Sequence, residues 1–329
     1  MSQKNNPITV VLGTGGTIAG VRHSEENLDV YKSGQLGITD ILRQAGLNQT
    51  AIEFEDIAQI DSKNMGLQVW QALLNAVAQA QARADVNAVL ITHGTDTIEE
   101  TAFLLHAFGP WPKPVLLTCA MRPADHPQAD GPEHLRQSLL LSQTPGVQGV
   151  HVVFNAQAHA ALHVQKISTD VYDAFSSGSA GGSAIFQQGS WQWRGALAEV
   201  EPLKVPSLDF FLQQSQWPRV EWLTHHAGSS VASLQVLLQD SNITPLLRGL
   251  VVAGTGAGTV SQAWEEGMQA VISKGLPVWL ASRCTWGRAL PGAQPSCARL
   301  TQLSPAKACM AMALALLAQD EKASAAQRF

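Results

Sequence analysis

Two stretches of this 329-residue sequence combine hydroxyl groups, carboxylates and glycines in patterns that could support chemistry. The first, VLGTGGTIAG from Val11 to Gly20, runs from an apolar segment into closely spaced glycines and threonines. The second, ITHGTDTIEET from Ile91 to Thr101, follows an apolar segment with His, Gly, Thr and Asp. Each follows a candidate strand, and α/β folds bind ligands at the carboxyl ends of their strands. Both loops are therefore candidates for a functional site, and the first could either bind a phosphate or present a nucleophile.

The first loop fits a nucleophile better than a phosphate site. A dinucleotide fingerprint needs a third glycine where Ile18 stands, and a Walker loop needs a lysine that this segment lacks. A tight strand-to-loop turn would also explain the glycines. Thr17, directly after Gly15 and Gly16, would present a hydroxyl where a substrate can approach the backbone. A threonine hydroxyl needs a base to become nucleophilic, so the rest of the chain must supply one.

Thr95 and Asp96 in the second loop stand at the predicted start of a helix, where backbone N–H groups and the helix dipole favour negative charge. Helix capping by Thr95 or Asp96, with a capping box over Thr97–Glu100, is one explanation. The same geometry would serve an oxyanion, or a carboxylate that holds the amino group of a substrate. Capping alone does not require His-Gly-Thr-Asp-Thr in succession, which favours a functional role.

The elements around these loops indicate an α/β fold. Short β-branched runs alternate with segments whose apolar residues recur at helical spacing, which predicts βαβ units on a mainly parallel sheet. Right-handed crossovers would place the carboxyl ends of the strands at one edge. We expect strands at Ile8–Leu12, Ile52–Ile60, Ala88–Thr92, Val115–Cys119 and Val150–Asn155, and helices at Leu67–Ala84 and Thr97–Phe108.

The second half of the chain repeats this alternation on a smaller scale. A Ser/Gly segment at 176–183 and a stretch from Trp191 to Trp217 without sustained periodicity separate the halves. We expect a larger N-terminal domain with a mainly parallel sheet flanked by helices (1–190), a linker (191–217) and a smaller C-terminal α/β domain (218–329). In the last part, the predicted strands are Val220–Thr224, Gly249–Ala253 and Pro277–Ala281, and the predicted helices are Val231–Leu238, Val260–Ser273 and Pro305–Ala318.

Composition limits the ligands that the chain can take. With a net charge of −5 it offers no basic face for nucleic acid, and no apolar run reaches the roughly 18–20 residues of a membrane span. The polar start from Met1 to Pro7 lacks the build of a secretory signal, so we expect a cytoplasmic protein. No CxxC pair occurs, which argues against a zinc site and a disulfide framework. The four cysteines are Cys119, Cys284, Cys297 and Cys309.

Both loops resemble signatures of one enzyme family, the bacterial-type L-asparaginases, which hydrolyse the side-chain amide of asparagine. GTGGTIAG is similar to the first signature of the family and THGTDTIEET to the second. CAMRP (Cys119–Pro123) and DGP (Asp130–Pro132) extend a similarity that covers most of the chain. The resemblance implies acyl transfer through a threonine ester, with neither a metal nor an organic cofactor.

The resemblance assigns catalytic roles to five residues. Thr17 matches the nucleophile and Tyr31, in NLDVYKSGQLG, matches the tyrosine that hydrogen-bonds its hydroxyl. Thr95 and Asp96 match the pair of the second signature, and Lys166, in VQKISTDVYDAF, completes a Thr-Lys-Asp cluster. Lys166 would act as base toward Thr95 and a bound water, with Asp96 orienting it and the Thr95 N–H as an oxyanion donor.

Substrate binding is expected at the ends of the same strands. Ser62, in DSKNM, matches the family serine that holds the substrate α-carboxylate, and Asp96 would take the α-ammonium group. The expected substrate-binding residues are Gly16, Asp61, Ser62, Lys63, Gly94, Asp96 and Ala120.

Three departures from the family pattern concern the substrate pocket. After Ser62 the sequence has Lys63 and Asn64 where the secreted enzymes carry Gln or Glu and then Asp or Asn, so Lys63 adds a cation near the substrate carboxylate. Ala257 stands where the family usually has an asparagine that reaches a neighbouring subunit's site, so we expect weaker activity. The segment Ser282–Pro295 lacks the glutamate that the secreted enzymes carry there.

Alternative functions remain at this stage. A glutaminase, or an amidotransferase subunit acting on charged tRNA, would use related chemistry; a low-turnover asparagine sensor would keep the pocket alone. A dinucleotide oxidoreductase is weakly indicated by GTGAGT at Gly254, where the third fingerprint glycine is also missing. Because the family builds its sites between chains, we expect a homo-oligomer, at least a dimer and by extension a dimer of dimers.

Overall fold

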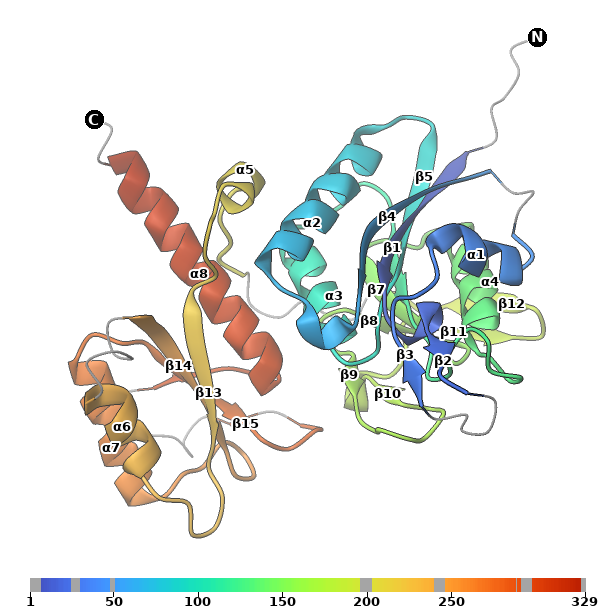
Figure 1. Ribbon diagram of the computed structural model, residues 1–329. Helices are drawn as coiled ribbons and strands as arrows, with labels where there is room; N and C mark the ends of the chain where they lie inside the picture. The colour runs from blue at the N-terminus through green and yellow to red at the C-terminus, as the bar shows by residue number, and fades with distance from the viewer. Residues whose placement is uncertain are drawn as a thin grey trace. The chain divides into compact units, whose positions relative to one another are not determined.

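The chain divides into two compact units, Met1–Ala198 and Glu199–Phe329. The computed structural model describes residues 7–24, 30–47, 51–195, 203–239, 246–287, 289–290 and 298–326. Figure 1 labels the helices and strands of both units. Cys297 and parts of the segment Ser282–Pro295 lie outside the described residues.

The first unit is built on an eight-stranded sheet whose strand order is β12-β11-β8-β7-β6-β5-β1-β4. Strands β4 to β7 and β1 are parallel, and β8, β11 and β12 continue the sheet in antiparallel fashion. This is the mainly parallel sheet that the sequence predicts. The strands are β1 (Ile8–Gly15), β4 (Ile52–Ile60), β5 (Val86–Thr92), β6 (Val115–Thr118), β7 (Val150–Phe154), β8 (Gln157–Ala160), β11 (Ala184–Gln187) and β12 (Ser190–Trp193).

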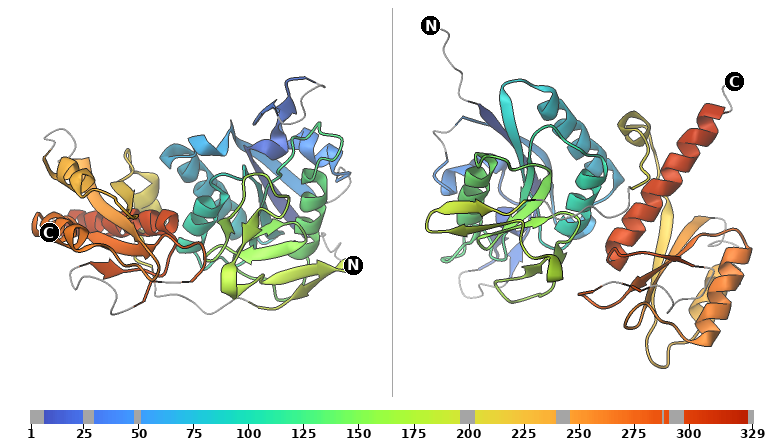
Figure 2. Two further views of the ribbon diagram at one scale, coloured as in Figure 1. Left: turned by 90° about the horizontal axis from the view of Figure 1, so that it is seen from below. Right: turned by 180° about the vertical axis from the view of Figure 1, so that it is seen from behind.

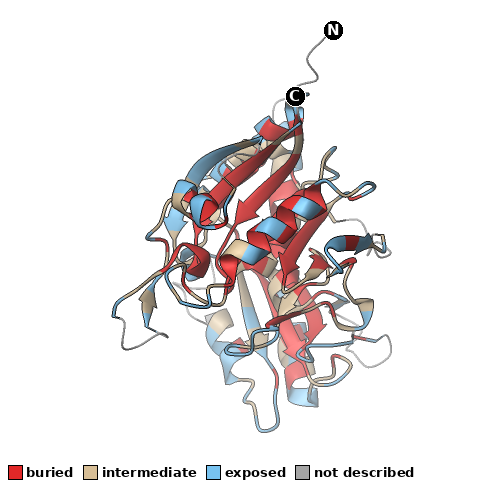
Figure 3. Ribbon diagram, turned by 90° about the vertical axis from the view of Figure 1, so that its right-hand side faces the viewer, coloured by how far each residue is buried: buried red, intermediate tan, exposed pale blue. Residues whose placement is uncertain are grey.

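Helices cover both faces of this sheet, which explains why its central strands are almost continuously apolar. The helices are α1 (Ile38–Gln44), α2 (Leu67–Ala82), α3 (Ile98–Ala107) and α4 (Gly131–Ser142). Helices α2 and α3 lie on one face, and α1 and α4 on the other, as two opposite views show (Figures 1 and 2). Figure 3 shows the resulting buried interior, and one core cluster joins α1 and α4 to the sheet.

The crossover through α4 differs in hand from those through α2 and α3. The chain moves from β4 through β5 and β6 to β7 in one direction across the sheet, yet α4 lies on the face opposite α2 and α3. The expectation of uniformly right-handed crossovers is therefore wrong at β6–α4–β7. Close packing accompanies the exception, because a Cβ on Gly131 at the start of α4 would lie 2.7 Å from Ile18 Cγ1.

The Ser/Gly segment at 176–183 lies inside the first unit. It contains the end of β10 (Phe175–Ser176) and the short η3 helix (Gly178–Ala180), and leads into β11. Strand β10 pairs with β9 (Gln165–Lys166), so this region folds back beside the sheet. Residues 191–193 of the expected linker are likewise paired, because they belong to β12.

The second unit is a four-stranded parallel sheet of order β13-β14-β15-β16. Helix α8 covers one face and helices α6 and α7 the other (Figure 1). A short helix, α5 (Leu208–Leu212), precedes the sheet. The remaining elements are β13 (Arg219–Thr224), α6 (Ala232–Gln239), β14 (Leu247–Gly254), α7 (Gln262–Ser273), β15 (Val278–Ser282), β16 (Arg299–Leu300) and α8 (Pro305–Ala326).

Candidate active site

Three strand ends of the first unit meet at two facing glycines. Gly16, with φ of 82°, ends the loop after β1, and a Cβ on it would lie 2.4 Å from Gly94 Cα. A Cβ on Gly94, after β5, would in turn lie 2.5 Å from Ser62 Oγ, after β4. Only glycine allows this backbone conformation and this approach. The glycines therefore bring the GTGGT, HGTD and DSK segments into direct contact.

Thr17 follows this contact as the first residue of the short η1 helix (Thr17–Ala19). The residue is buried, and its Oγ1 lies 2.9 Å from Tyr31 Oη, so the two hydroxyls share one hydrogen bond. Tyr31 belongs to β3 (Tyr31–Lys32), which pairs with β2 (Val21–Arg22). The hairpin is fixed to the loop after β6, because the Arg22 backbone and guanidinium donate hydrogen bonds to Asp125. The fold thus holds the Tyr31 hydroxyl within hydrogen-bonding distance of the Thr17 hydroxyl.

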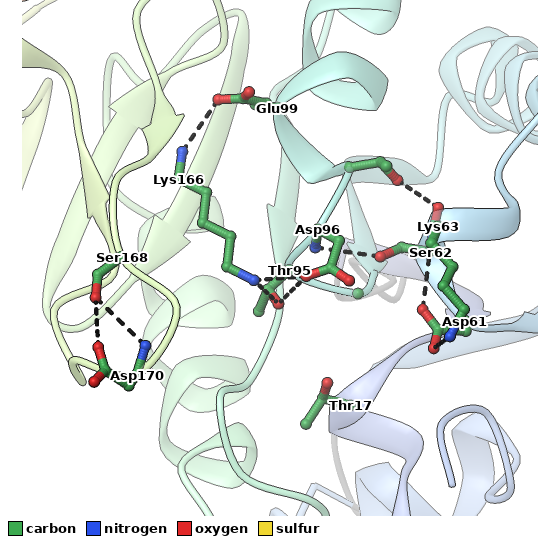
Figure 4. Close-up of polar contacts among 12 residues, drawn as sticks. Thr17, Asp61, Ser62, Lys63, Thr95, Asp96, Glu99, Lys166, Ser168 and Asp170 are labelled. Carbon is green, nitrogen blue, oxygen red and sulfur yellow. Dashed lines mark hydrogen bonds and ion pairs between the residues drawn. The ribbon is translucent and has the colours of Figure 1, made fainter. Parts of the chain in front are cut away.

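Thr95, Asp96 and Lys166 form a compact polar cluster (Figure 4). Lys166 Nζ donates hydrogen bonds to Thr95 Oγ1 at 2.9 Å and to Asp96 Oδ1 at 2.6 Å. Thr95 Oγ1 lies 3.4 Å from the same Asp96 oxygen. Lys166 comes from β9, whose backbone N–H at Lys166 is held by Glu99 Oε2 on α3 at 3.1 Å. A lysine nitrogen is thereby fixed against a threonine hydroxyl, as proton transfer between them requires.

Ser62 connects the β4 end to the second signature. Its Oγ accepts a hydrogen bond from the Asp96 N–H at 3.2 Å, and its carbonyl accepts one from Thr97 Oγ1 at 2.7 Å. Since the hydroxyl oxygen is used as an acceptor, its own proton is left for an acceptor group. Figure 4 shows Ser62 beside Asp96, with Thr17 facing the same space.

Asp61 and Lys63 flank Ser62 and form an ion pair of 2.8 Å between Lys63 Nζ and Asp61 Oδ2. Asp61 also accepts a hydrogen bond from the Lys63 backbone N–H, which caps the short η2 helix (Ser62–Asn64). Partial burial would raise the pKa of Asp61, but the Lys63 hydrogen bonds outweigh it and leave this pKa below its usual value. Asp61 therefore stays a carboxylate that holds Lys63 near Ser62.

The CAMRP and DGP segments form the support behind the site. Asp130 is buried, and its carboxylate accepts hydrogen bonds from the backbone N–H groups of Met121 and Arg122 at 2.8 and 2.9 Å. This fixes the turn after β6, where Ala120 is fully buried. His134 Nδ1 lies 2.9 Å from the Cys119 carbonyl oxygen, which can only accept, so Nδ1 carries the hydrogen and donates this hydrogen bond. The two segments are thus linked by hydrogen bonds.

Neither the buried histidine nor the buried cysteine beside the cluster offers a ready base or nucleophile. Burial lowers the pKa of His93 to about 4, and the hydrogen bond from its Nδ1 to the Gly94 carbonyl opposes this only in part. Burial raises the pKa of the Cys119 thiol well above its ordinary value. At neutral pH these side chains are an uncharged imidazole and an uncharged thiol.

The capping explanation for the second loop is wrong. Helix α3 begins at Ile98 with Thr97 as its N-cap, and no side-chain hydrogen bond caps it. Thr97 donates to the Ser62 carbonyl, while Thr95 and Asp96 contact Lys166. These hydroxyl and carboxylate groups contact residues of other elements, and they do not cap α3.

Two contacts that help to position the site were not expected from the sequence. Thr97 ties the second signature to the β4 end, and Glu99 fixes the backbone at Lys166. Both contacts join segments that are far apart in the sequence, Thr97 with Ser62 and Glu99 with Lys166, so no local pattern signals them.

The glycine-rich turn of the second unit is closed on itself. Thr255 and Thr259 exchange backbone hydrogen bonds, and their Oγ1 atoms lie 3.0 Å apart. The Ala257 carbonyl accepts a hydrogen bond from the Leu290 N–H, and Ser282 Oγ donates to the Gly256 carbonyl at 2.6 Å. Sequence and structure thus place Ala257 in an ordered turn after β14.

No group of three or more His, Cys, Asp or Glu side chains within the described ranges could hold a metal ion. Of the helices that the structure describes, none is long and apolar enough to cross a membrane.

Comparisons with known proteins match most of the chain, in both units. The model of the family "Asparaginase, N-terminal" matches residues 9–198, and "Glutaminase/Asparaginase C-terminal domain" matches residues 219–329. L-asparaginase 2 of Bacillus subtilis is 28% identical over 95% of this chain and 84% of its own. The probable periplasmic L-asparaginase of Haemophilus influenzae is 31% identical over 85% of this chain and 79% of its own.

A solved structure has the same fold. The crystal structure of a probable cytoplasmic L-asparaginase from Campylobacter jejuni superposes with a TM-score of 0.83 at 29% identity, covering 96% of this chain and 98% of the other. The two signature loops, their contact at Gly16 and Gly94 and the matched domains agree on one assignment: the chain belongs to the asparaginase family.

Proposed function

We propose that this protein is an L-asparagine amidohydrolase, which releases ammonia and L-aspartate through a threonine ester. The observation that carries the proposal is the cluster in which Lys166 Nζ contacts both Thr95 Oγ1 and Asp96 Oδ1, across from the Thr17–Tyr31 pair. A hydroxyl that only stabilises a fold does not need a lysine and a carboxylate fixed beside it. Family membership supports the same activity.

In the first half-reaction, Thr17 Oγ1 forms a bond to the side-chain amide carbon, and the C–N bond breaks to release ammonia. Tyr31 Oη, 2.9 Å from this oxygen, is placed to take part in moving its proton toward the leaving nitrogen. The Thr95 N–H is the proposed donor to the developing oxyanion.

In the second half-reaction, water attacks the ester carbon, the bond from that carbon to Thr17 Oγ1 breaks, and Thr17 Oγ1 takes back a proton, for which Tyr31 Oη is placed at 2.9 Å. Lys166, once it has given up a proton, would accept the Thr95 proton over the 2.9 Å contact, and Thr95 would take one from water. Asp96 holds the lysine in place through Oδ1 and would offer Oδ2 to the substrate ammonium group. Ser62 would donate its hydroxyl proton to the substrate carboxylate. Gly16, Gly94 and Ala120 would form the nearby backbone of this pocket.

The sites are proposed to be completed by a second copy of the chain, so that the working form is a homo-oligomer, and we propose a dimer of dimers. A cytoplasmic location is likewise proposed, supported by the polar start of the sequence and by the similarity to the probable cytoplasmic L-asparaginase of Campylobacter jejuni. A glutaminase activity is the second candidate, because the C-terminal family model covers both glutaminases and asparaginases. One methylene separates the two substrates, a difference of about 1–3 kcal/mol in a pocket.

The test is ammonia release from L-asparagine and, separately, from L-glutamine by the purified protein and by Thr17→Ala. We expect release from asparagine that falls by at least about 1,000-fold in the variant, as removal of a nucleophile does. Equal release by both proteins would refute the nucleophile. Release from glutamine alone would identify a glutaminase, and asparagine that only raises the melting temperature would identify a sensor.

A further inference from the structure

Lys63 is a cation at the pocket that the catalytic steps do not use. It follows Ser62 directly, in the η2 helix, and its side chain is 68% exposed. Its ammonium group is held by Asp61 at 2.8 Å. A lysine whose head group is exposed yet tethered can meet a ligand with less loss of side-chain freedom than an unrestrained lysine.

The charges around Lys63 favour a protonated ammonium group. The Asp61 hydrogen bond and charge, and more weakly the charges of Asp96 and Tyr31, raise the pKa of Lys63 above its ordinary value. Figure 4 shows the Lys63–Asp61 pair beside Ser62, on the side away from Asp96, so the ammonium group lies next to the polar cluster.

The charge pairs around the pocket leave Lys63 as the cation that could balance a substrate carboxylate. Among the residues that the structure describes here, Asp61 is paired with Lys63 and Asp96 with Lys166. Ser62 can donate one hydrogen bond to a substrate carboxylate but carries no charge to balance it. A carboxylate moved out of water into such a pocket needs a cation as well as a hydroxyl. Lys63 is the adjacent residue that provides one.

We propose that Lys63 is a specificity-determining residue that binds the carboxylate of the substrate with its ammonium group, beside the Ser62 hydroxyl. The ligand class is a primary amide that carries a carboxylate group, whether or not it also carries an amino group. This inference rests on the proposed function for the identity of the pocket. A purely structural role for Lys63, as the partner that holds Asp61 in the η2 turn, is the competing explanation.

The experiment measures binding without turnover. In the Thr17→Ala background, calorimetry would give Kd for three amides: L-asparagine, succinamate, which lacks its amino group, and 3-aminopropanamide, which lacks its carboxylate. Each is compared with and without Lys63→Gln. We expect Lys63→Gln to raise Kd about tenfold for the two carboxylates and less than about twofold for 3-aminopropanamide, since a charge-assisted hydrogen bond is lost only in the former.

Two variants provide controls. Lys63→Arg keeps the charge and should restore most of the preference for carboxylates. Lys32→Gln removes an exposed lysine in β3, one residue from Tyr31, where successive side chains point to opposite faces; it should leave all three Kd values unchanged.

Equal weakening of all three amides by Lys63→Gln would overturn the proposal and support the structural role, as would unchanged binding of the carboxylates. Failure of Thr17→Ala to bind either carboxylate would also overturn it. The proposed function is judged separately, by ammonia release with Thr17 intact, so an inactive protein that still prefers carboxylates through Lys63 would refute the activity and retain the binding role.

Discussion

The chain contains two glycine-rich stretches of nearly the same sequence, GTGGT at the end of β1 and GTGAGT at the end of β14, and each of these strands is buried between parallel neighbours. In the second turn, Thr255 and Thr259 bond to each other, so their hydroxyl groups stabilise the turn itself. In the first, the Thr17 hydroxyl bonds to Tyr31 from another hairpin. The difference lies less in the turn than in what neighbouring strands bring to it.

Neighbouring strands bring different groups in the two units. Beside the first turn, the β4 and β5 ends supply Ser62, Thr95 and Asp96, and β9 adds Lys166. Beside the second, the β15 end supplies Ser282, whose hydroxyl is used by the turn's own backbone. A glycine-rich loop is thus permissive for chemistry, and ionisable groups that converge on it from other strands decide whether it reacts.

The largest difference should appear in activity when one threonine hydroxyl is removed from each region. Thr95→Val breaks the contact with Lys166 and should lower kcat for asparagine by about 1,000-fold, a typical effect of losing acid–base catalysis. Thr259→Val removes hydrogen bonds inside the second turn and should destabilise the protein by about 1 kcal/mol, with kcat changed less than about threefold. Similar losses of kcat in steady-state assays would mean that the two turns do not differ as described.

Glycine replacement tests how tightly each turn is packed. Gly16→Ala places a Cβ 2.4 Å from the Gly94 backbone, at a φ of 82°, and should lower the free energy of unfolding by more than about 3 kcal/mol. Gly256→Ala also has positive φ, 47°, but its Cβ would meet no atom within 4 Å, so about 1 kcal/mol is expected. Urea unfolding of both variants measures the difference, and equal destabilisation would contradict the close contact at Gly94.

Acidification should weaken the first unit through its buried histidines. Burial lowers the pKa of His151 to about 4, while its Nε2–H donates to the Gln148 carbonyl and its Nδ1 lies 2.8 Å from Ser183 Oγ. Because the folded pKa lies below that of the unfolded chain, near 6.5, the stability is complete above about pH 6.5 and falls as pH drops toward 4. The free energy of unfolding should fall by roughly 2 kcal/mol by pH 5 through His151 alone.

His151→Asn isolates this contribution. The variant should be less stable than the parent at pH 7.5, but it should lose less stability between pH 7.5 and pH 5. A parallel loss in both proteins, measured by urea unfolding, would show that His151 is not responsible for the acid sensitivity.

The smallest expected effect concerns the hydroxyl that distinguishes the first turn. Tyr31→Phe keeps the ring but removes the 2.9 Å contact with Thr17, and kcat should fall about tenfold, while the melting temperature stays close to that of the parent. An unchanged kcat would mean that Tyr31 only packs in the structure, and that its hydrogen bond to Thr17 does not distinguish the first turn from the second in catalysis.

The sequence predicted the parallel strands well because their apolar, β-branched runs reflect burial on both faces. The prediction of Ile52–Ile60 matches β4 in full, and the class of a large and a smaller α/β unit is confirmed. Helix α4 was missed because its buried face includes His134, Gln137 and Ser138, which leaves no apolar stripe. The short strand β11 was missed because the glycine and serine around it imitate a linker, and β8 was missed because its four residues, Gln, Ala, His and Ala, include none that is β-branched.

Local patterns indicated Thr17, Thr95 and Asp96, but not their partners. Tyr31 lies 14 residues from Thr17, and Lys166 lies 71 residues from Thr95, each in a two-residue strand that no periodicity marks. Only the family resemblance indicated them. The Thr97 and Glu99 contacts depend on the relative placement of β4, α3 and β9, which no single segment encodes.

The position of strand β4 at an edge of the sheet bears on whether folded molecules aggregate at high concentration. This strand is one of the two edge strands of the eight-stranded sheet and is nine residues long, so one side of its backbone has no strand of the same sheet beside it and could pair with a strand of another molecule. Yet its exposed side chains include Glu55 and Asp56, together with Glu53, which is paired with Arg83 of the same molecule. A second copy of this strand laid alongside would bring like charges together. The acidic residues of β4 therefore disfavour edge-to-edge pairing of the sheet, at the same strand whose carboxyl end leads directly into Asp61 and Ser62.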